Sequence, residues 1–252
     1  MAQITNPTFQ NLRDEAASML WKTVDLSDDP TVGKFELQVH RDYPDAPLSP
    51  IYMAMRKKGV KTGTLEDADF DLIGQTLAAY ANENGMFDQT RYVAGIPAAG
   101  EPFVTGMIDR LNSTFSNARR FYLRKETGED GKTQIIPPEN LGELPIEELM
   151  QDTLLVDDLV TKAGTKIQAV KATRYFGANV KDMLVMVNRS GGLARPALAE
   201  IGVELHSVWE FDHLLEYWAS EHRFGNKDET DAWLQAIQAY PKQLAAYLEA
   251  QG

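Results

Sequence analysis

The feature that most constrains the fold of this chain is the run Leu154–Thr165, where an apolar segment, two acids and a loop of small residues follow one another. The apolar residues indicate a buried strand, which we expect to end at the adjacent acids Asp157 and Asp158. The loop behind them leads into a segment with helical spacing. In open α/β sheets ligands bind beyond the carboxyl ends of the strands, so both carboxylates are expected to face a binding crevice.

The loop after the two acids has the character of a phosphate-binding site. A helix start offers free backbone N–H groups and the positive end of the helix dipole, and threonine hydroxyls add further donors. Carboxylates beside such a loop suit ribose, because carboxylate oxygens accept hydrogen bonds from hydroxyl groups. An ordinary strand-to-helix turn with an aspartate cap is the plainer alternative, but the complete combination favours a ligand site. The expected phosphate-binding residues are Thr161, Lys162, Ala163, Gly164 and Thr165.

Short apolar segments alternate with helical segments along the middle of the chain. The predicted strands lie at residues 92–96, 121–123, 153–156, 183–187 and 203–208. The predicted helices lie at residues 67–84, 103–111, 164–176 and 193–201. Strands that alternate with helices predict an α/β fold, in which helices flank both faces of a parallel sheet.

The N-terminal part of the chain follows other patterns. Residues 1–22 have helical spacing, and a second strand is expected to begin at residue 50. Between them Phe35, Leu37 and Val39 alternate with polar residues, as the side chains of a half-buried strand do. We therefore expect a helix followed by a small β structure, called the hood below.

The C-terminal part is predicted to be wholly helical over residues 211–251, with breaks near Gly225 and Pro241. Its apolar residues are expected to belong to a core rather than to an interface. The chain then divides into three predicted parts. These are an N-terminal helix with the hood at 1–64, an α/β core at 65–208 and a helical C-terminal extension at 209–252.

Composition excludes several classes of function. A hydrophobic share of 43% and a charged share of 25% are ordinary for soluble globular proteins, and no apolar stretch is long enough to cross a bilayer. We expect a soluble cytoplasmic protein without a membrane partner. The net charge of −12 argues against nucleic acid as a partner. The absence of cysteine excludes disulfides and thiolate metal sites, and the four histidines lack metal-ligand spacing, so no metal held by side chains is expected.

The run Leu154–Thr165 resembles the phosphoribosyl pyrophosphate signature of the type I phosphoribosyltransferases. The resemblance implies that Asp157 and Asp158 hold the 2′- and 3′-hydroxyls of the ribose and that the loop holds its 5′-phosphate. Lys162 and Ala163 stand where the family often has threonine and glycine. Ala163 would hinder a positive φ at its position, which bears on the loop conformation.

Two further segments resemble the orotate phosphoribosyltransferases of that family. The loop Gly95–Pro102 resembles one that contacts pyrophosphate through backbone amides, and its expected contacts are Ala98, Ala99 and Gly100. Tight packing of a helix on a sheet is an equally good explanation of this loop. The segment Arg124-Lys125-Glu126 resembles the start of a mobile catalytic loop, so Arg124 and Lys125, together with Asp158, are the expected catalytic residues.

The base pocket is indicated by two shorter matches. Ser49–Tyr52 resembles a Ser-Pro-aromatic segment that lines the pocket, which implies a binding role for Tyr52, but the Lys-Ser-Gly that precedes it in the family is absent. Asn188 and Arg189 resemble an Asp-Arg pair whose arginine meets the carboxylate of the base, with Asn188 in place of the aspartate. A surface cation in a turn is the alternative for Arg189.

Taken together, the resemblance implies phosphoribosyl transfer from 5-phosphoribosyl 1-pyrophosphate to a nitrogenous base, with orotate favoured, and release of pyrophosphate. It also implies Mg²⁺ bound mainly through the substrate, a homodimer and a place in pyrimidine biosynthesis. Two alternatives stay open. A non-catalytic or regulatory binder is favoured by Gly128 and Asp130, which stand where the family has a lysine and a histidine. A transferase for another base is favoured by Asn188 and the missing Lys-Ser-Gly.

Overall fold

The computed structural model describes residues 7–59, 63–88, 90, 92–97, 99–114, 119–127, 133–136 and 152–251. The chain divides into two compact units. The core unit comprises Met1–Ala16 and Glu66–Glu210, and the terminal unit comprises Ala17–Leu65 and Phe211–Gly252. The boundaries after Leu65 and Glu210 lie close to those predicted after residues 64 and 208, but residues 1–16 belong to the core unit and not to a separate N-terminal part. The prediction does not include the grouping of both end segments into one unit.

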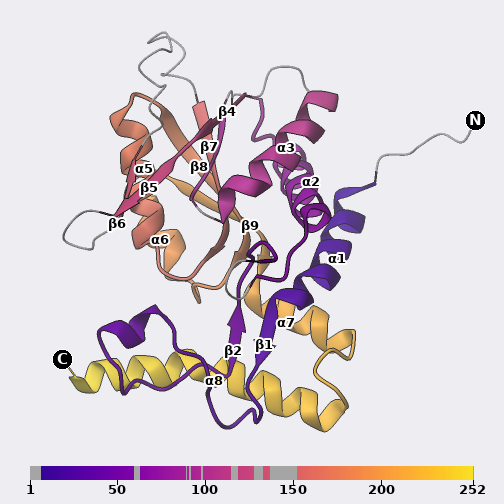
Figure 1. Ribbon diagram of the computed structural model, residues 1–252, viewed down its shortest axis with the longest axis vertical. Helices are drawn as coiled ribbons and strands as arrows, with labels where there is room; N and C mark the ends of the chain where they lie inside the picture. The colour runs from indigo at the N-terminus through magenta and orange to yellow at the C-terminus, as the bar shows by residue number, and fades with distance from the viewer. Residues whose placement is uncertain are drawn as a thin grey trace, which may run out of the picture. The chain divides into compact units, whose positions relative to one another are not determined.

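The core unit is built on a five-stranded sheet with the strand order β4-β3-β7-β8-β9, and every neighbouring pair is parallel. Strand β3 and residues 183–187 of β8 are buried and apolar, as expected where helices cover both faces of a sheet. This sheet confirms the predicted parallel α/β fold (Figure 1). The strands are β3 (Tyr92–Gly95), β4 (Arg119–Tyr122), β7 (Asp152–Val160), β8 (Asn179–Asn188) and β9 (Glu204–Glu210).

Helices flank this sheet. The apolar core formed by α5 and α6 contains alternate residues of the strands, among them Leu155, Met183 and Leu205. Helix α2 packs on α3, and the two contact the strands β8 and β9 and the strands β3 and β7, respectively. The helix bounds are α2 (Asp67–Glu83), α3 (Gly100–Thr114), α5 (Gly164–Tyr175) and α6 (Ala194–Ala199). No helix in the described part of the chain has the length and apolar character that crossing a membrane requires.

A second, antiparallel sheet in the core unit consists of β5 (Arg124–Thr127) and β6 (Thr133–Ile136). Ile135 of β6 is buried in the same apolar core as Ala163 and Ala169, next to and within α5. The strands predicted from the sequence do not include β6. Four residues with only two apolar side chains are too short to give a clear strand pattern.

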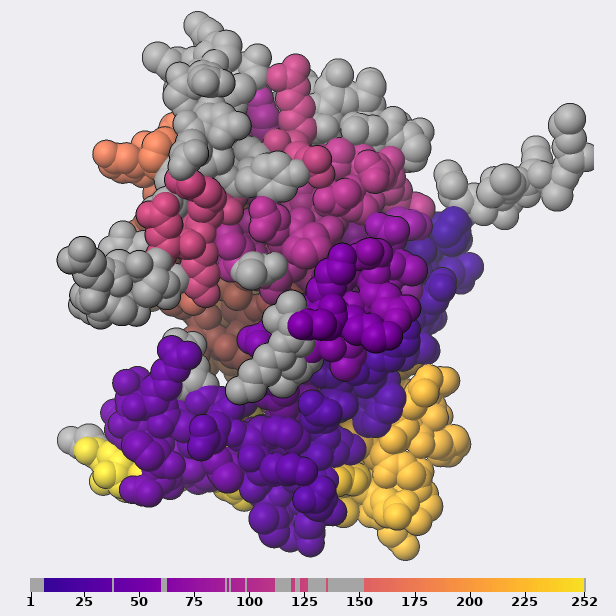
Figure 2. Space-filling model, viewed as in Figure 1, coloured from indigo at the N-terminus to yellow at the C-terminus, as the bar shows by residue number. Residues whose placement is uncertain are grey.

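The terminal unit packs the segment Ala17–Leu65 together with the C-terminal helices. The 3₁₀ helix η1 (Trp21–Thr23) packs on the C-terminal helices, because the Trp21 ring lies 5.2 Å from that of Trp218 and 5.1 Å from that of Phe224. Trp218 is fully buried, as the sequence predicts for this helix, and donates a hydrogen bond of 2.7 Å to the Ala17 carbonyl. Figure 2 shows the indigo N-terminal and yellow C-terminal surfaces of this unit in contact. Its other elements are β1 (Val24–Leu26), β2 (Ile51–Met53), α7 (Phe211–Ser220) and α8 (Lys227–Gln251), while α1 (Phe9–Leu20) begins in the core unit.

The strand predicted over Phe35–Val39 is wrong. Only an isolated bridge joins Phe35 to Ser49, and the 3₁₀ helix η2 (Gln38–Arg41) follows it. The imidazole of the buried His40 accounts for this difference. Its Nδ1 lies 2.8 Å from the Leu37 backbone nitrogen and its Nε2 lies 3.2 Å from the Ala46 carbonyl oxygen, so a side chain occupies backbone groups that a strand would pair.

The predicted break at Pro241 is also wrong, because α8 continues through that residue. A proline inside a helix removes one hydrogen bond, here the one to the Ile237 carbonyl. Ile237 and Tyr240 are both buried, and their burial offsets this loss. The break near Gly225 is confirmed, since α7 ends at Ser220 and α8 begins at Lys227, with Gly225 at a φ of 105°.

Candidate active site

The two acids lie within β7 rather than behind it. The strand extends to Val160, and Asp157 pairs in register with Val185 of β8. The backbone N–H of Arg189, just beyond β8, donates a hydrogen bond of 2.8 Å to the Val160 carbonyl. The predicted strand end before Asp157 is therefore wrong, because β8 provides partners for four more residues of β7. The carboxyl ends of β7 and β8 still meet at one edge of the sheet.

A lysine that the sequence analysis does not single out lies beside the first acid. Lys166, in the first turn of α5, places its Nζ 2.7 Å from Asp157 Oδ2. Both side chains are nearly buried, with exposed fractions of 12% and 5%, respectively. Removing either partner would leave a charge with little solvent around it, which is costly. The sequence offers one signal for this pair. Lys166 comes two residues after the start of α5, and this helix follows the strand that carries the acids.

The second acid holds its proton more firmly than an ordinary carboxyl group. Burial and the neighbouring charge of Asp157 raise the pKa of Asp158 to about 8, although Lys166 and the Leu159 backbone N–H act in the opposite direction. Asp158 Oδ1 accepts that N–H at 2.6 Å. Near neutral pH Asp158 is thus able to donate one hydrogen bond as well as accept others, as ribose hydroxyls require.

The start of α5 is open for an anion. Ala163 precedes the helix with φ −73° and ψ −10°, and no side chain caps the first turn. The sequence analysis expects Ala163 to hinder a positive φ in the loop, but its φ is negative and its backbone is right-handed, so alanine causes no strain here. A Cβ at Gly164 would meet no atom within 4 Å. Thr161, Lys162 and Thr165 are exposed around it, so N–H groups, hydroxyls and a cation gather at a positive helix end.

The turn between β3 and α3 packs against β7 directly before Asp157. The Ile96 N–H donates a hydrogen bond of 2.8 Å to the Val156 carbonyl. A Cβ at Gly100 would collide with that same carbonyl oxygen, and a Cβ at Gly95 would lie 2.5 Å from the Glu101 backbone. Glycine is thus required at both positions for close backbone approach. Of the predicted pyrophosphate contacts, Gly100 begins α3 and Ala99 is half-buried beside it, while Ala98 lies outside the described residues.

The predicted catalytic cations lie on β5. Lys125 is exposed and pairs in register with Ile135. Ile135 is buried next to α5, the helix that follows the predicted phosphate loop. Arg124 is half-buried, and its Nη2 lies 3.6 Å from Glu126 Oε1. Gly128 and Asp130, which mark the departure from the family pattern, lie outside the described residues.

Polar side chains at the carboxyl ends of β8 and β9 form a network around Asn188. Its Nδ2 donates to Glu210 Oε2 at 2.9 Å, and its Oδ1 accepts hydrogen bonds from the Ser190 N–H and hydroxyl. Burial alone would raise the pKa of Glu210, but hydrogen bonds from Ser207, Arg195 and Asn188 lower it. Asn188 therefore fixes the turn that carries the half-buried Arg189. No pattern in the sequence indicates Arg195 or Glu210 as part of this network.

Tyr52, predicted to line a base pocket, belongs to the terminal unit. It lies on β2 and stacks on Phe35, with ring centroids 5.9 Å apart and an angle of 26° between the rings. Its role towards a base stays a prediction. The core unit by itself brings together the acids of β7, the open start of α5, the glycine turn before α3 and the backbone of Arg189.

Comparisons with known proteins relate this arrangement to one family. No family-level sequence model matches the chain. An orotate phosphoribosyltransferase of Methanoculleus marisnigri is 30% identical to it over 157 residues, which cover 62% of this chain and 80% of the relative.

Two solved structures share the fold. The UMP synthase of Leishmania donovani matches with a TM-score of 0.62 and 21% identity, covering 91% of this chain, which in turn spans only 43% of that protein. The orotate phosphoribosyltransferase of Mycobacterium tuberculosis H37Rv in complex with 5-phospho-α-D-ribosyl 1-diphosphate matches with a TM-score of 0.52 and 21% identity, covering 81% and 98% of the two chains. With the M. marisnigri relative matched at 30% identity over 80% of its length, the chain belongs to the orotate phosphoribosyltransferase family.

Proposed function

We propose that this protein transfers the 5-phosphoribosyl group of phosphoribosyl pyrophosphate to orotate and releases pyrophosphate. The observation that carries the proposal is the pair Asp157 and Asp158 on β7, followed directly by the uncapped start of α5. Family membership supports the same reaction, because the relative from M. marisnigri is named for it. The M. tuberculosis protein of the same fold was solved in complex with this donor.

The ribose phosphate is proposed to bind in two parts. The first N–H groups of α5 and the hydroxyls of Thr161 and Thr165 would hold the 5′-phosphate, with Lys162 contributing charge. Asp157 and Asp158 would hold the 2′- and 3′-hydroxyls. The raised pKa of Asp158 suits this role, since a protonated carboxyl group donates to one hydroxyl oxygen while it accepts from another group.

The remaining groups are proposed to act on the two reacting fragments. Bond breaking at the anomeric carbon creates positive charge on the ribose and a polyanionic leaving group. Backbone amides of 98–100 and the cations Arg124 and Lys125 would stabilise the departing pyrophosphate, where preorganised donors contribute most. Arg189 would bind the carboxylate of orotate through charge-assisted hydrogen bonds.

The residues present fit Mg²⁺ bound through the substrate. Carboxylate and phosphate oxygens are the ligands that this ion prefers, and it usually keeps several of its waters. Asp157 and Asp158 on β7 would offer carboxylate oxygens of this kind beside the substrate. When bound to the pyrophosphate oxygens, Mg²⁺ would neutralise part of the leaving charge, and no dedicated side-chain cage is needed.

We further propose that the protein acts in the cytoplasm as a homodimer, as the family resemblance implies. In the family the cations of the catalytic loop often reach across a dimer interface, which would bear on Arg124 and Lys125 here. Light scattering during size-exclusion chromatography measures the mass of the assembly directly. A monomeric mass under assay conditions would overturn this part of the proposal.

The decisive experiment measures pyrophosphate release from phosphoribosyl pyrophosphate with Mg²⁺ and a panel of bases. Orotate is expected to be turned over well above uracil, adenine and hypoxanthine. The variant Asp157→Asn should lose activity, and circular dichroism checks that the fold survives the loss of the Lys166 partner. Turnover of a purine in preference to orotate would favour the alternative of a transferase for another base.

A second candidate function, a binder without turnover, has specific support in two ion pairs. Asp157 is engaged by Lys166, and Arg124 is engaged by Glu126. In these pairs the predicted ribose ligand Asp157 and the predicted catalytic cation Arg124 each already have a partner of opposite charge. The departures at Gly128 and Asp130 point the same way. A rise in melting temperature with phosphoribosyl pyrophosphate, but no pyrophosphate release with any base, would favour this candidate.

A further inference from the structure

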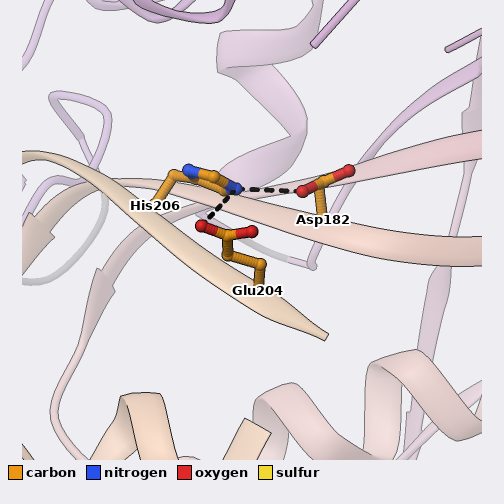
Figure 3. Close-up of side chains that lie close together, drawn as sticks. All are labelled: Asp182, Glu204 and His206. Carbon is orange, nitrogen blue, oxygen red and sulfur yellow. Dashed lines mark hydrogen bonds and ion pairs between the residues drawn. The ribbon is translucent and has the colours of Figure 1, made fainter. Parts of the chain in front are cut away.

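Three metal-ligating side chains meet outside the candidate active site, near the amino ends of two neighbouring strands. Asp182 lies on β8, and Glu204 and His206 lie on β9. The parallel register pairs Asp182 with Glu204, and His206 follows two residues later on the same face. One ligand atom from each residue lies within 4.8 Å of the other two. Figure 3 shows the two carboxylates and the imidazole pointing toward one another.

This three-residue cluster is separate from the predicted phosphoribosyl site. Met183 and Leu205 pack in the apolar core with residues of α5 and α6. Because successive side chains of a strand point to opposite faces, the cluster projects from the other face of the sheet. Asp157, in contrast, pairs with Lys166 of α5. An ion bound to the cluster would therefore lie across the sheet from the substrate.

The cluster contains more carboxylate than its imidazole can satisfy. His206 Nε2 lies 2.9 Å from Asp182 Oδ1 and 4.0 Å from Glu204 Oε1. A ring nitrogen carries at most one hydrogen, so Nε2 serves one carboxylate at a time. Within the part of the chain that the structure describes, these two carboxylates have no ion pair with a lysine or arginine. A divalent cation would neutralise both carboxylates and accept the Nε2 lone pair.

We propose that Asp182, Glu204 and His206 bind a divalent transition-metal ion of the Zn²⁺ type. Nitrogen and oxygen ligands lie about 2.0–2.2 Å from Zn²⁺, which places neighbouring ligand atoms about 3–4 Å apart. The separations of 2.9 and 4.0 Å fit this geometry after small side-chain movements. One imidazole with two carboxylates favours such an ion over Mg²⁺ or Ca²⁺, which prefer oxygen alone.

Access and rigidity support the same site. The exposed fractions of the Glu204, Asp182 and His206 side chains are 76%, 33% and 17%, so an ion can enter from solvent and keep a water as a fourth ligand. The hydrogen-bonded strands hold the backbone of all three residues. Since β9 is the edge strand of the sheet, the ion would fasten it to β8 and stabilise the folded chain.

The test uses the full chain freed of metal with a chelator, and Co²⁺ alone as the probe, without nucleotide. We expect one equivalent of Co²⁺ to bind, with a visible absorption band and a higher melting temperature. Glu204→Gln and His206→Gln should each weaken binding by about tenfold or more, whereas the exposed His213→Gln serves as the matched control. Asp157→Asn should bind as the wild type does, which separates this site from the acids of β7.

Two results would overturn the proposal. One is a wild-type chain that binds no Co²⁺ at millimolar concentration. The other is a Glu204→Gln variant with unchanged affinity, which is informative because this exposed side chain is replaced without disturbing the fold. If His206→Gln fails to fold, Glu204→Gln still decides the question. The outcome does not depend on whether the protein transfers phosphoribosyl groups.

Discussion

Lys166 Nζ lies 2.7 Å from Asp157 Oδ2, and this ion pair sits where the family resemblance leads one to expect an acid free to hold ribose. The pair has a direct consequence for the site. Lys166 already neutralises Asp157, so a ribose hydroxyl bound there as proposed would share the carboxylate with the ammonium group or displace it. Meanwhile the second acid titrates under the influence of both charges.

Replacing Lys166 by methionine should destabilise the protein by about 3–5 kcal/mol, because the change leaves the Asp157 carboxylate nearly buried without its partner. Urea unfolding measures the loss. The double variant Lys166→Met/Asp157→Asn should recover much of it, since neither side chain then carries a charge. Lys162→Met, in the exposed loop before α5, is the matched control and should change stability by less than about 0.5 kcal/mol. A Lys166→Met protein as stable as the wild type would contradict a structural role for the pair.

The raised pKa of Asp158 predicts how stability depends on pH. The folded chain keeps this proton up to a pH of about 8, whereas the unfolded chain loses it near the ordinary value of 3.8. The stabilising effect is therefore complete below about pH 4 and is lost as the pH rises to about 8. Asp158→Asn removes the titration, so its stability relative to the wild type should increase over that range.

Denaturant midpoints at pH 5, 6.5 and 8 would check this expectation. The exposed Asp45→Asn controls for the general loss of a negative charge and should follow the wild type at every pH. If the wild type and Asp158→Asn gave parallel curves, Asp158 would be ionised throughout, and its proposed ability to donate a hydrogen bond to ribose would be lost with it.

The architecture of the core unit could be predicted because β3, β7 and β8 each contain a continuous apolar segment and helical segments lie between the strands. Such a pattern can be recognised without knowledge of the tertiary structure. The strand predicted at Phe35–Val39 fails for the opposite reason. Its alternation is correct, but His40 satisfies backbone groups that a strand partner would need, and a local side-chain contact of this kind has no periodic signal.

The residues of the candidate site likewise fall into those that the sequence reveals and those that only tertiary contacts reveal. Asp157 and Asp158 are evident from the sequence, since two adjacent acids directly after an apolar run are conspicuous. Lys166 is not, because its partner is defined by how α5 folds back on β7. Asp182 and His206 are 24 residues apart, and they meet only through the register of β8 with β9. Contacts across a sheet require the pairing of strands, which the spacing of residues along the chain does not reveal.

Arg189→Ala should lower kcat/KM for orotate by an amount equal to about 2–4 kcal/mol, as expected when a carboxylate of the base loses its charge-assisted partner. The backbone bond from Arg189 to the Val160 carbonyl remains, so the sheet edge is kept. Any activity with uracil, which lacks the carboxylate, is the internal control and should scarcely change. Equal losses for both bases would assign Arg189 a structural role instead.

A transferase and a binder without turnover differ in the rate at which they convert orotate. Arg124 and Lys125 are present, but Gly128 and Asp130 replace two further cations of the family pattern. A missing electrostatic donor at a developing charge commonly costs about 10²–10³ in turnover, while ground-state binding suffers less. We therefore expect firm binding of phosphoribosyl pyrophosphate, seen as a rise in melting temperature, together with slow turnover of orotate.

Restoring the cations tests this explanation. Gly128→Lys with Asp130→His should raise kcat more than it changes the affinity for phosphoribosyl pyrophosphate, because these groups act mainly on the departing pyrophosphate. The matched control is Gly128→Gln with Asp130→Asn, which fills the same positions with polar groups that lack the charge. Equal gains in both double variants would attribute the effect to loop conformation rather than to charge. A wild type that is already fast would mean that other cations replace the missing pair. If the lysine and histidine variant binds the donor yet stays inert with every base, the binder becomes the better description of this protein.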